Sequence, residues 1–332
     1  MCGFAGFIQP LNHEVEAKLH LAAMLRSIIH RGPDDEGSWL DNNCGVALGH
    51  RRLSILDLSP SGHQPMLSSC GRFVIIFNGE IYNHQELRKE LDLSNLLTIG
   101  GWRGHSDTET ILACFAAYGV RKTLQSMVGM FALVLWDRQE KTLTLARDRI
   151  GEKPLYYGWQ NDVFLFGSEL KSLREHPKFV GEMNWHAAST FLRLNYIPAP
   201  SCIYRGIFKL LPGTFLQITQ DNIERKDIAC PAPYWSLEES VNLGKQNPFV
   251  GSFKDAVDEV EMLVRQAVQL QSVADVPVGA FLSGGIDSST VVAMLKSSTN
   301  SKVTTFSIGM PEAKMDESEH AAAVARHLGT NH

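Results

Sequence analysis

A cysteine at position 2 is the residue of this sequence best placed to act as a nucleophile, because the chain opens Met1-Cys2-Gly3. Removal of Met1 would give Cys2 a free α-amine in addition to its thiol. The unperturbed pKa of such an amine is near ~8, so it could accept the thiol proton at neutral pH, directly or through a water. The alternative is an ordinary cysteine in an edge strand, which position alone favours.

A second candidate site is a run of glycine, serine and aspartate between a predicted strand and a predicted helix. Its members are Ser283, Gly284, Gly285, Asp287, Ser288 and Ser289. Backbone N–H groups at such a loop can approach an anion, and the helix dipole adds to the attraction. Asp287 could hold Mg²⁺ bound to pyrophosphate. The lysine of a Walker loop is absent, which favours release of pyrophosphate over γ-phosphoryl transfer. The alternative is a glycine-rich turn with a serine cap.

Short strands separated by polar turns dominate the first ~170 residues and predict an antiparallel sheet. They are residues 72–77, 130–137, 142–148, 154–158 and 163–166. The first should end at Asn78-Gly79, a strong turn signal. Helices are predicted over 107–118 and over 15–29, the latter with an apolar face of Val15, Leu19, Ala22, Leu25 and Ile29. The expected fold is α+β, with helices layered on antiparallel sheets.

The pattern changes after about residue 195. Prolines punctuate the chain up to Pro248 and suggest an inter-domain connection. A helix should begin after Ser252, with Asp255 completing a capping box. A buried strand (276–282), a helix (287–295), a strand (303–308) and a helix (316–328) then alternate, which predicts βαβ units and a parallel sheet. Only two or three strands fit before His332, so we expect the chain to stop within this domain.

Composition excludes several classes of partner. The chain has 332 residues, a net charge of -5 and a pI near 6.2, which gives no attraction for nucleic acid or anionic membranes. Its six cysteines are scattered, without disulfide or zinc spacing, and no secretory signal or membrane-spanning run is present. We therefore expect a cytoplasmic protein.

Several motifs in a fixed order carry a resemblance to a known family. They are Cys2-Gly3-Phe4-Ala5-Gly6, His30-Arg31-Gly32-Pro33-Asp34, Arg52-Leu53-Ser54-Ile55, Asn78-Gly79-Glu80-Ile81-Tyr82-Asn83, Ser106-Asp107-Thr108-Glu109, Arg147-Asp148-Arg149, Lys153-Pro154-Leu155-Tyr156-Tyr157 and Ser168-Glu169-Leu170-Lys171. This set resembles class II glutamine amidotransferases, which have an N-terminal-nucleophile fold. Together with residues 283–289 it resembles glutamine-hydrolysing asparagine synthetase of the bacterial B type.

The resemblance implies roles for residues of the first domain. Arg52 would bind the α-carboxylate of glutamine, and Asp107 its α-ammonium with help from Glu80. Asn78 and the N–H of Gly79 would stabilise the oxyanion formed when Cys2 attacks. The alternatives are an exposed arginine, a hairpin turn and a helix-capping Ser106-Asp107. We expect His30 and Arg31 to shape the loop around Cys2, with direct catalysis as the alternative.

In the second domain the resemblance implies an ATP-pyrophosphatase-like α/β fold. Leu282 and Ile308 would flank adenine, or else pack in a core, and Asp316-Glu317 would bind metal or start a helix. The expected substrates are glutamine, aspartate and ATP with Mg²⁺, with no tightly bound organic cofactor and a possible homodimer.

The expected domains are residues 2–215 (glutaminase), 216–250 (connection) and 251–332 (start of the synthetase domain). The resemblance implies that ammonia from glutamine amidates aspartate through an acyl-adenylate, while the chain as it stands should retain at most glutaminase activity. Alternatives are another carboxylate acceptor, such as a sugar acid, and a non-catalytic fragment that pairs with full-length subunits.

Overall fold

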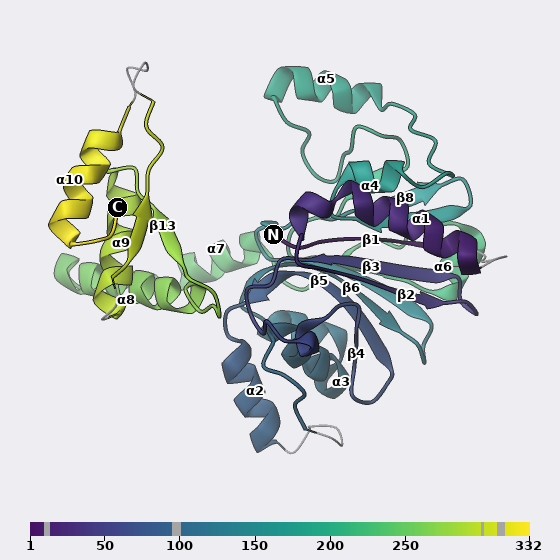
Figure 1. Ribbon diagram of the computed structural model, residues 1–332, viewed down its shortest axis with the longest axis horizontal. Helices are drawn as coiled ribbons and strands as arrows, with labels where there is room; N and C mark the ends of the chain where they lie inside the picture. Colours follow the sequence, from purple (N-terminus) through teal and green to yellow (C-terminus); the bar gives the residue numbers. More distant parts are fainter. Residues whose placement is uncertain (10–13, 95–100, 300–301, 311–315) are drawn as a thin grey trace. The chain divides into compact units, whose positions relative to one another are not determined.

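The structure is a computed structural model that describes residues 1–9, 14–94, 101–299, 302–310 and 316–332. The chain forms two compact units, residues Met1–Asn242 and Leu243–His332. We refer to them as the N-terminal unit and the C-terminal unit. Figure 1 shows the elements of each unit.

The N-terminal unit is built on two six-stranded sheets, in which neighbouring strands run antiparallel (Figure 1). The first sheet has the order β10-β8-β9-β1-β3-β2 and the second β12-β11-β7-β6-β5-β4. The strands are β1 (Gly3–Ile8), β2 (Asp35–Asp41), β3 (Val46–Arg52), β4 (Met66–Leu67), β5 (Phe73–Ile81), β6 (Gly129–Asp137), β7 (Thr142–Arg147), β8 (Tyr156–Gln160), β9 (Val163–Gly167), β10 (Ile207–Lys209), β11 (Thr214–Ile218) and β12 (Ala232–Pro233).

Helices lie on the outer face of each sheet. The helices of this unit are α1 (Glu14–Ser27), η1 (Ile29–Arg31), η2 (Pro60–Gly62), α2 (His84–Leu93), α3 (Asp107–Ser126), α4 (Leu170–Arg174), α5 (Trp185–Leu194) and α6 (Gln220–Arg225), while α7 (Leu237–Gln246) crosses the division between the units. Helices α1 and α4 cover the first sheet, and α2 and α3 cover the second (Figure 1). This is the layered α+β fold expected from the sequence.

Strand alternation explains how β1 serves two cores. Its residues are all buried, because Phe4 and Ile8 point between the sheets while Ala5 and Phe7 point toward α1. The core between the sheets also holds Trp136. Strand β1 pairs with β3 on one side and β9 on the other, so the chain that follows Cys2 is fixed at both edges.

Two local predictions for this unit are wrong. The dipeptide Asn78-Gly79 is not a turn, since β5 continues through it to Ile81 in register with β6. In α1 the buried residues are Ala17, Leu21, Met24 and Leu25, whereas Val15 and Leu19 are exposed. The buried face of α1 is thus set by its contact with the sheet and not by the pattern we expected.

The C-terminal unit contains a parallel pair of strands with helices. Its elements are α8 (Phe253–Gln271), β13 (Gly279–Phe281), α9 (Ile286–Ser298), β14 (Thr304–Phe306) and α10 (Ser318–Leu328). The Ser252–Asp255 capping box is present at α8, and Asn331 bridges Thr304 in the parallel sense, as the start of a third strand would. The strand expected to be buried is not, because Phe281 in β13 is 77% exposed.

The proline-rich segment is more ordered than its composition suggested. Residues 214–218 form β11, which pairs with β7, and β12 pairs with β11. Both strands lie in the N-terminal unit, which extends to Asn242. No helix among the described residues is long and apolar enough to cross a membrane.

Candidate active site

One pocket of the N-terminal unit brings together the residues that were expected, from the family resemblance, to bind or hydrolyse glutamine. Its wall includes Cys2, Arg52, Asn78, Gly79, Glu80 and Asp107. They come from the residue before β1, the end of β3, the second half of β5 and the first residue of α3. The two sheets and one helix terminus therefore converge on this pocket.

The Cys2 thiol lies against the strand end that carries Arg52. Its Sγ accepts a hydrogen bond from Leu53 N at 3.3 Å. Burial raises the pKa of the Cys2 thiol above its ordinary value, and the Leu53 hydrogen bond only partly opposes this. A thiol of raised pKa needs a nearby base to become a thiolate.

The backbone of Cys2 is fixed by the loop that precedes β2. Arg31 Nε donates to the Cys2 carbonyl oxygen at 2.9 Å, and Arg31 Nη1 donates to Glu169 Oε1 at 2.9 Å. Gly3 leaves room for this arginine, since a Cβ at Gly3 would lie 2.7 Å from Arg31 Cδ. His30 reaches the same carboxylate from an exposed position, 3.0 Å from Glu169 Oε1. Both residues thus contact the surroundings of Cys2, and neither lines the pocket.

The edge of β5 that faces away from β6 directs the Gly79 N–H toward the pocket. Alternate N–H groups of a strand point to the same edge. Phe77 N donates to Gln64 Oε1 at 2.7 Å, and Ile81 N donates to Asp107 Oδ2 at 2.9 Å, both away from β6. Gly79 N lies between them and must point the same way. A side chain is excluded here, because a Cβ at Gly79 would lie 2.2 Å from the Met130 carbonyl oxygen.

The Asn78 side chain offers a second donor next to the first. Asn78 is 1% exposed, and among the described residues its Nδ2 has no hydrogen-bond partner. A buried amide donor without a partner is costly, and such groups are rare in folded proteins. Gly79 N–H and Asn78 Nδ2 therefore form a pair of donors in the pocket wall that also holds Cys2.

Arg52 is held by main-chain carbonyl groups of the loop that follows it. Its Nη2 donates to the carbonyl oxygens of Leu56, at 3.1 Å, and of Asp57, and Nη1 donates to that of Ser59 at 3.3 Å. The side chain is 7% exposed and lines the pocket. A guanidinium has five N–H donors, so this arrangement leaves some for a carboxylate. Arg52 is thus a preformed cation and not the exposed arginine of the alternative.

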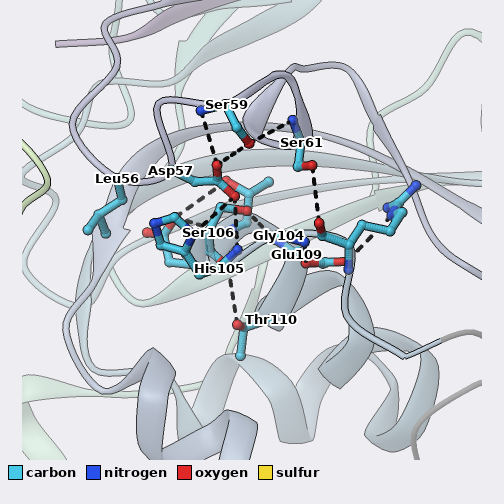
Figure 2. A network of polar contacts seen from close by, with 12 residues as sticks. Leu56, Asp57, Ser59, Ser61, Gly104, His105, Ser106, Glu109 and Thr110 are labelled. Carbon is cyan, nitrogen blue, oxygen red and sulfur yellow. Dashed lines mark hydrogen bonds and ion pairs between the residues drawn. The ribbon is translucent and has the colours of Figure 1, made fainter.

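Asp57 joins the Arg52 loop to the start of α3. Figure 2 shows its carboxylate between Ser59 and His105: Oδ1 accepts from Ser59 N at 3.2 Å, and Oδ2 accepts from His105 N at 2.9 Å. Ser106 then caps α3 by accepting from Glu109 N at 3.2 Å. This network sets the position of Asp107 relative to Arg52.

Two carboxyl groups face the same space. Asp107 Oδ1 accepts from Thr108 N at 2.7 Å, in addition to the bond from Ile81. Burial nevertheless raises the pKa of Asp107 to about 6, and burial also raises the pKa of Glu80. A substrate ammonium placed between them would favour their charged forms.

Lys153 and Gln64 also line the pocket, although no role for either was predicted from the sequence. Gln64 Oε1 fixes the edge of β5, and Gln64 Nε2 donates to Thr108 Oγ1 at 3.3 Å. Lys153 belongs to one of the family motifs, and its place there could have indicated that it is a functional residue. For Gln64 no local pattern gave a signal.

The glycine- and serine-rich loop of the C-terminal unit joins β13 to α9. Gly284 has a φ of +81°, and a Cβ there would lie 2.8 Å from His320 Cβ, so glycine is required. Ser283 Oγ and Ser288 Oγ lie 2.9 Å apart, and Asp287 is exposed. In the described residues Ser289 Oγ is buried without a partner. Gly285 N donates to Ser283 Oγ at 3.3 Å.

The two residues expected to flank adenine differ in exposure. Leu282 is 2% exposed and packs with Val292, Ala321 and Ala325, whereas Ile308 is 74% exposed. Of these two side chains only that of Ile308 is accessible. Asp316 Oδ1 accepts a hydrogen bond from Ser318 N, the first residue of α10, at 3.0 Å.

Two comparisons with known proteins identify the class of protein to which the N-terminal unit belongs. The fold is similar to that of a solved structure described as glutamine phosphoribosylpyrophosphate (PRPP) amidotransferase from B. subtilis complexed with ADP and GMP, with a TM-score of 0.52 and 16% identity over 99% of this chain and 90% of that one. Residues 1–235 match the family described as "Glutamine amidotransferase domain". The chain belongs to this family.

The second match concerns the C-terminal unit. Residues 259–332 match the family described as "Asparagine synthase". A curated relative from Methanocaldococcus jannaschii, "Putative asparagine synthetase [glutamine-hydrolyzing] 2", is 36% identical over 100% of this chain and 64% of its own length. "Asparagine synthetase [glutamine-hydrolyzing] 1" of Bacillus subtilis is 35% identical over 99% of this chain and 49% of its own. The resemblance seen in the sequence is confirmed, and the chain spans between about half and two thirds of these relatives.

Proposed function

We propose that the N-terminal unit hydrolyses the side-chain amide of glutamine with Cys2 as nucleophile. The observation that carries this proposal is a pair of donors in one pocket with the Cys2 thiol. They are Asn78 Nδ2, which has no partner among the described residues, and the Gly79 N–H, which points away from β6. Two neighbouring donors in one pocket wall are suited to the oxyanion of a tetrahedral intermediate. The alternative of a non-catalytic fragment gives no reason for a buried donor that lacks a partner among the described residues and shares a pocket with a thiol.

The chemistry follows from the arrangement of the groups. The α-amine of Cys2, freed by removal of Met1, takes the thiol proton directly or through a water, and the thiolate attacks the amide carbon of glutamine. Asn78 and Gly79 stabilise the oxyanion. Collapse of the intermediate breaks the C–N bond, the amine returns its proton to the departing ammonia, and a thioester remains on Cys2. Water then hydrolyses the thioester to glutamate.

Substrate recognition uses both ends of the pocket. Arg52 would bind the α-carboxylate, and Asp107, with Glu80, would bind the α-ammonium. These contacts hold the substrate while leaving its amide beside Cys2. They also exclude simple amides that lack the charged amino-acid end.

For the whole protein we propose glutamine-dependent synthesis of asparagine. Ammonia from the N-terminal unit would amidate aspartate, which MgATP first activates as an acyl-adenylate with release of pyrophosphate. The match of residues 259–332 to the asparagine synthase family supports this. Ser283, Gly284, Gly285, Ser288 and Ser289 would contact phosphate oxygens, and Asp287 would hold the Mg²⁺. The Ile308 side chain would lie near adenine, whereas Leu282 could be near it only through its main chain, because its side chain is buried. Asparagine formed from aspartate, MgATP and glutamine is the product to measure, with a sugar acid as the rival acceptor.

The test of the glutaminase is Cys2→Ala. We expect this variant to release no ammonia from glutamine, because the covalent step is lost. Binding should persist, since Arg52 and Asp107 remain, and a glutamine-dependent rise in melting temperature would show it. Retained hydrolysis would rule out Cys2 as the nucleophile.

A further inference from the structure

The loop of residues 148–153 is folded around one buried carboxylate. Asp148, which is 1% exposed, accepts hydrogen bonds from five backbone N–H groups. The donors are Phe131 N (3.2 Å), Ile150 N (3.1 Å), Gly151 N, Glu152 N (2.9 Å) and Lys153 N (3.0 Å). Gly151, with a φ of +80°, permits the tight turn. Arg147 Nε adds a bond to the Lys153 carbonyl oxygen at 2.7 Å. The position of Lys153 is therefore fixed by its backbone.

This fixed backbone places the Lys153 side chain in the pocket of Cys2. Lys153 is 5% exposed and shares the pocket wall with Met1, Cys2 and Glu80. Its Nζ donates to Met1 Sδ at 3.3 Å. A thioether is a weak acceptor, and burial of an ammonium is costly unless it is well paired. Removal of Met1 would also remove this acceptor. A charge kept in a pocket at such cost is a candidate for a role in its chemistry.

We propose that Lys153 is a positioning residue that acts through the α-amine of Cys2: once Met1 is removed, its ammonium group disfavours protonation of that amine. This inference rests on the proposed function. The reason is the repulsion between two like charges in a poorly solvated pocket. The amine then remains a free base at neutral pH and can take the thiol proton.

Other charged groups also act on this amine. The pKa of the α-amine of Met1 is lowered, first by burial and then by Arg31 and Lys153, while the Cys2 thiolate and Asp34 oppose the change. Burial lowers the pKa of Lys153 itself, and neighbouring carboxylates oppose that shift. The acidic groups that face the amine, the thiol or Lys153 are Asp34, Glu80, Asp107, Asp148 and Glu152. Arg31 donates hydrogen bonds to the Cys2 carbonyl oxygen and to the Glu169 carboxylate, so its replacement would also release the Cys2 backbone. Lys153 makes no such bond to Cys2 among the described residues, and its charge can therefore be removed separately.

The test is a direct titration of the amine. Protein lacking Met1 and labelled with [¹³C]cysteine reports the Cys2 Cα signal by NMR, and the signal is assigned by its absence from the Cys2→Ala variant. We expect the amine pKa to be higher in Lys153→Met than in the wild type by on the order of one unit. Lys153→Gln is a second neutral variant, and Lys153→Arg should restore the wild-type value. Lys178→Met, which removes a lysine that pairs with Asp162 outside the pocket, is the matched control and should change nothing.

The acidic limb of the kcat/KM profile for glutamine should move with the amine. An amine pKa that is equal in the wild type and both neutral variants overturns the inference. A wild type without glutaminase activity refutes the proposed function, whereas the NMR titration still decides the role of Lys153. If the pKa of the amine shifts in the neutral variants but the acidic limb of kcat/KM does not, the amine is not the catalytic base, and that part of the proposed function is refuted. The effect of Lys153 on the amine pKa would still be supported.

Discussion

Replacement of Asn78 by alanine should slow glutamine hydrolysis without destabilising the N-terminal unit. This combination is unusual, because most substitutions of a buried polar residue lose stability. It is expected here because Asn78 Nδ2 has no partner among the described residues and so contributes a cost to the folded state. The same donor becomes useful only when an oxyanion forms beside it.

The size of each effect can be estimated. An unpaired buried donor costs about 1–3 kcal/mol, and truncation of the side chain loses packing worth about 1 kcal/mol. Asn78→Ala should therefore leave the free energy of unfolding unchanged or raise it by up to about 2 kcal/mol. Loss of an oxyanion donor typically lowers kcat by about 10²–10³-fold, or about 2.7–4 kcal/mol, with little change in KM.

The chain offers a matched control in Asn83. Its Nδ2 donates to the Ser126 carbonyl oxygen at 3.0 Å, and its Oδ1 accepts from Val128 N at 2.9 Å. Asn83→Ala should thus cost about 2 kcal/mol of stability and leave kcat nearly unchanged. All six tryptophans precede residue 243, so tryptophan fluorescence during urea unfolding reports on the N-terminal unit alone. Ammonia release gives kcat and KM for both variants.

Two outcomes would refute the reasoning. A loss of stability in Asn78→Ala as large as that in Asn83→Ala would show that the Asn78 amide is a structural donor. A raised KM with unchanged kcat would assign it to binding of the substrate ground state.

Two further predictions concern the charges around Cys2 and the substrate. An uncleavable N-terminal extension that retains Met1 should abolish glutaminase turnover although the thiol remains, because the Cys2 nitrogen is then an amide that cannot take a proton; normal ammonia release would assign the base to another group, such as His30. Glutamine should bind more weakly as the pH falls through about 6, because burial raises the pKa of Asp107 to about 6 and only its carboxylate attracts the ammonium. Calorimetric titration of the Cys2→Ala variant with glutamine between about pH 5 and 8 measures this affinity. Addition of Asp107→Asn to that variant should make binding weak at every pH. An affinity of Cys2→Ala that does not change with pH would contradict the role of Asp107 in binding the ammonium.

The sequence predicted those features of the fold that depend on local signals. The helix cap at Ser106, the capping box at Ser252 and most strands of the first ~170 residues lie where they were expected. Asn78-Gly79 was misread because its turn preference is local, whereas the pairing of β5 with β6 is not. The same pairing directs the Gly79 N–H away from β6, and the Asn78 side chain is buried. The incorrectly predicted turn is therefore the proposed oxyanion site.

Features that depend on distant contacts could not be predicted. The position of Lys153 follows from the Asp148 carboxylate and its five N–H donors, an arrangement that no spacing in the sequence indicates. Burial on α1 and β13 likewise depends on which surfaces pack against them. Val15 and Phe281 are apolar and yet exposed, because apolar character alone does not supply a neighbour.

The place of β1 between β3 and β9 has a consequence for the order of events during biosynthesis. Its partner β9 ends at Gly167, so about 160 residues must be translated after β1 before that edge can pair. At about 5–20 residues per second this takes roughly 8–30 seconds, during which the nascent N-terminus is open to a methionine-removing enzyme. Once the sheet closes, the Met1–Cys2 peptide bond lies at the wall of the pocket. Removal of Met1 can therefore begin well before β1 is paired at both of its edges.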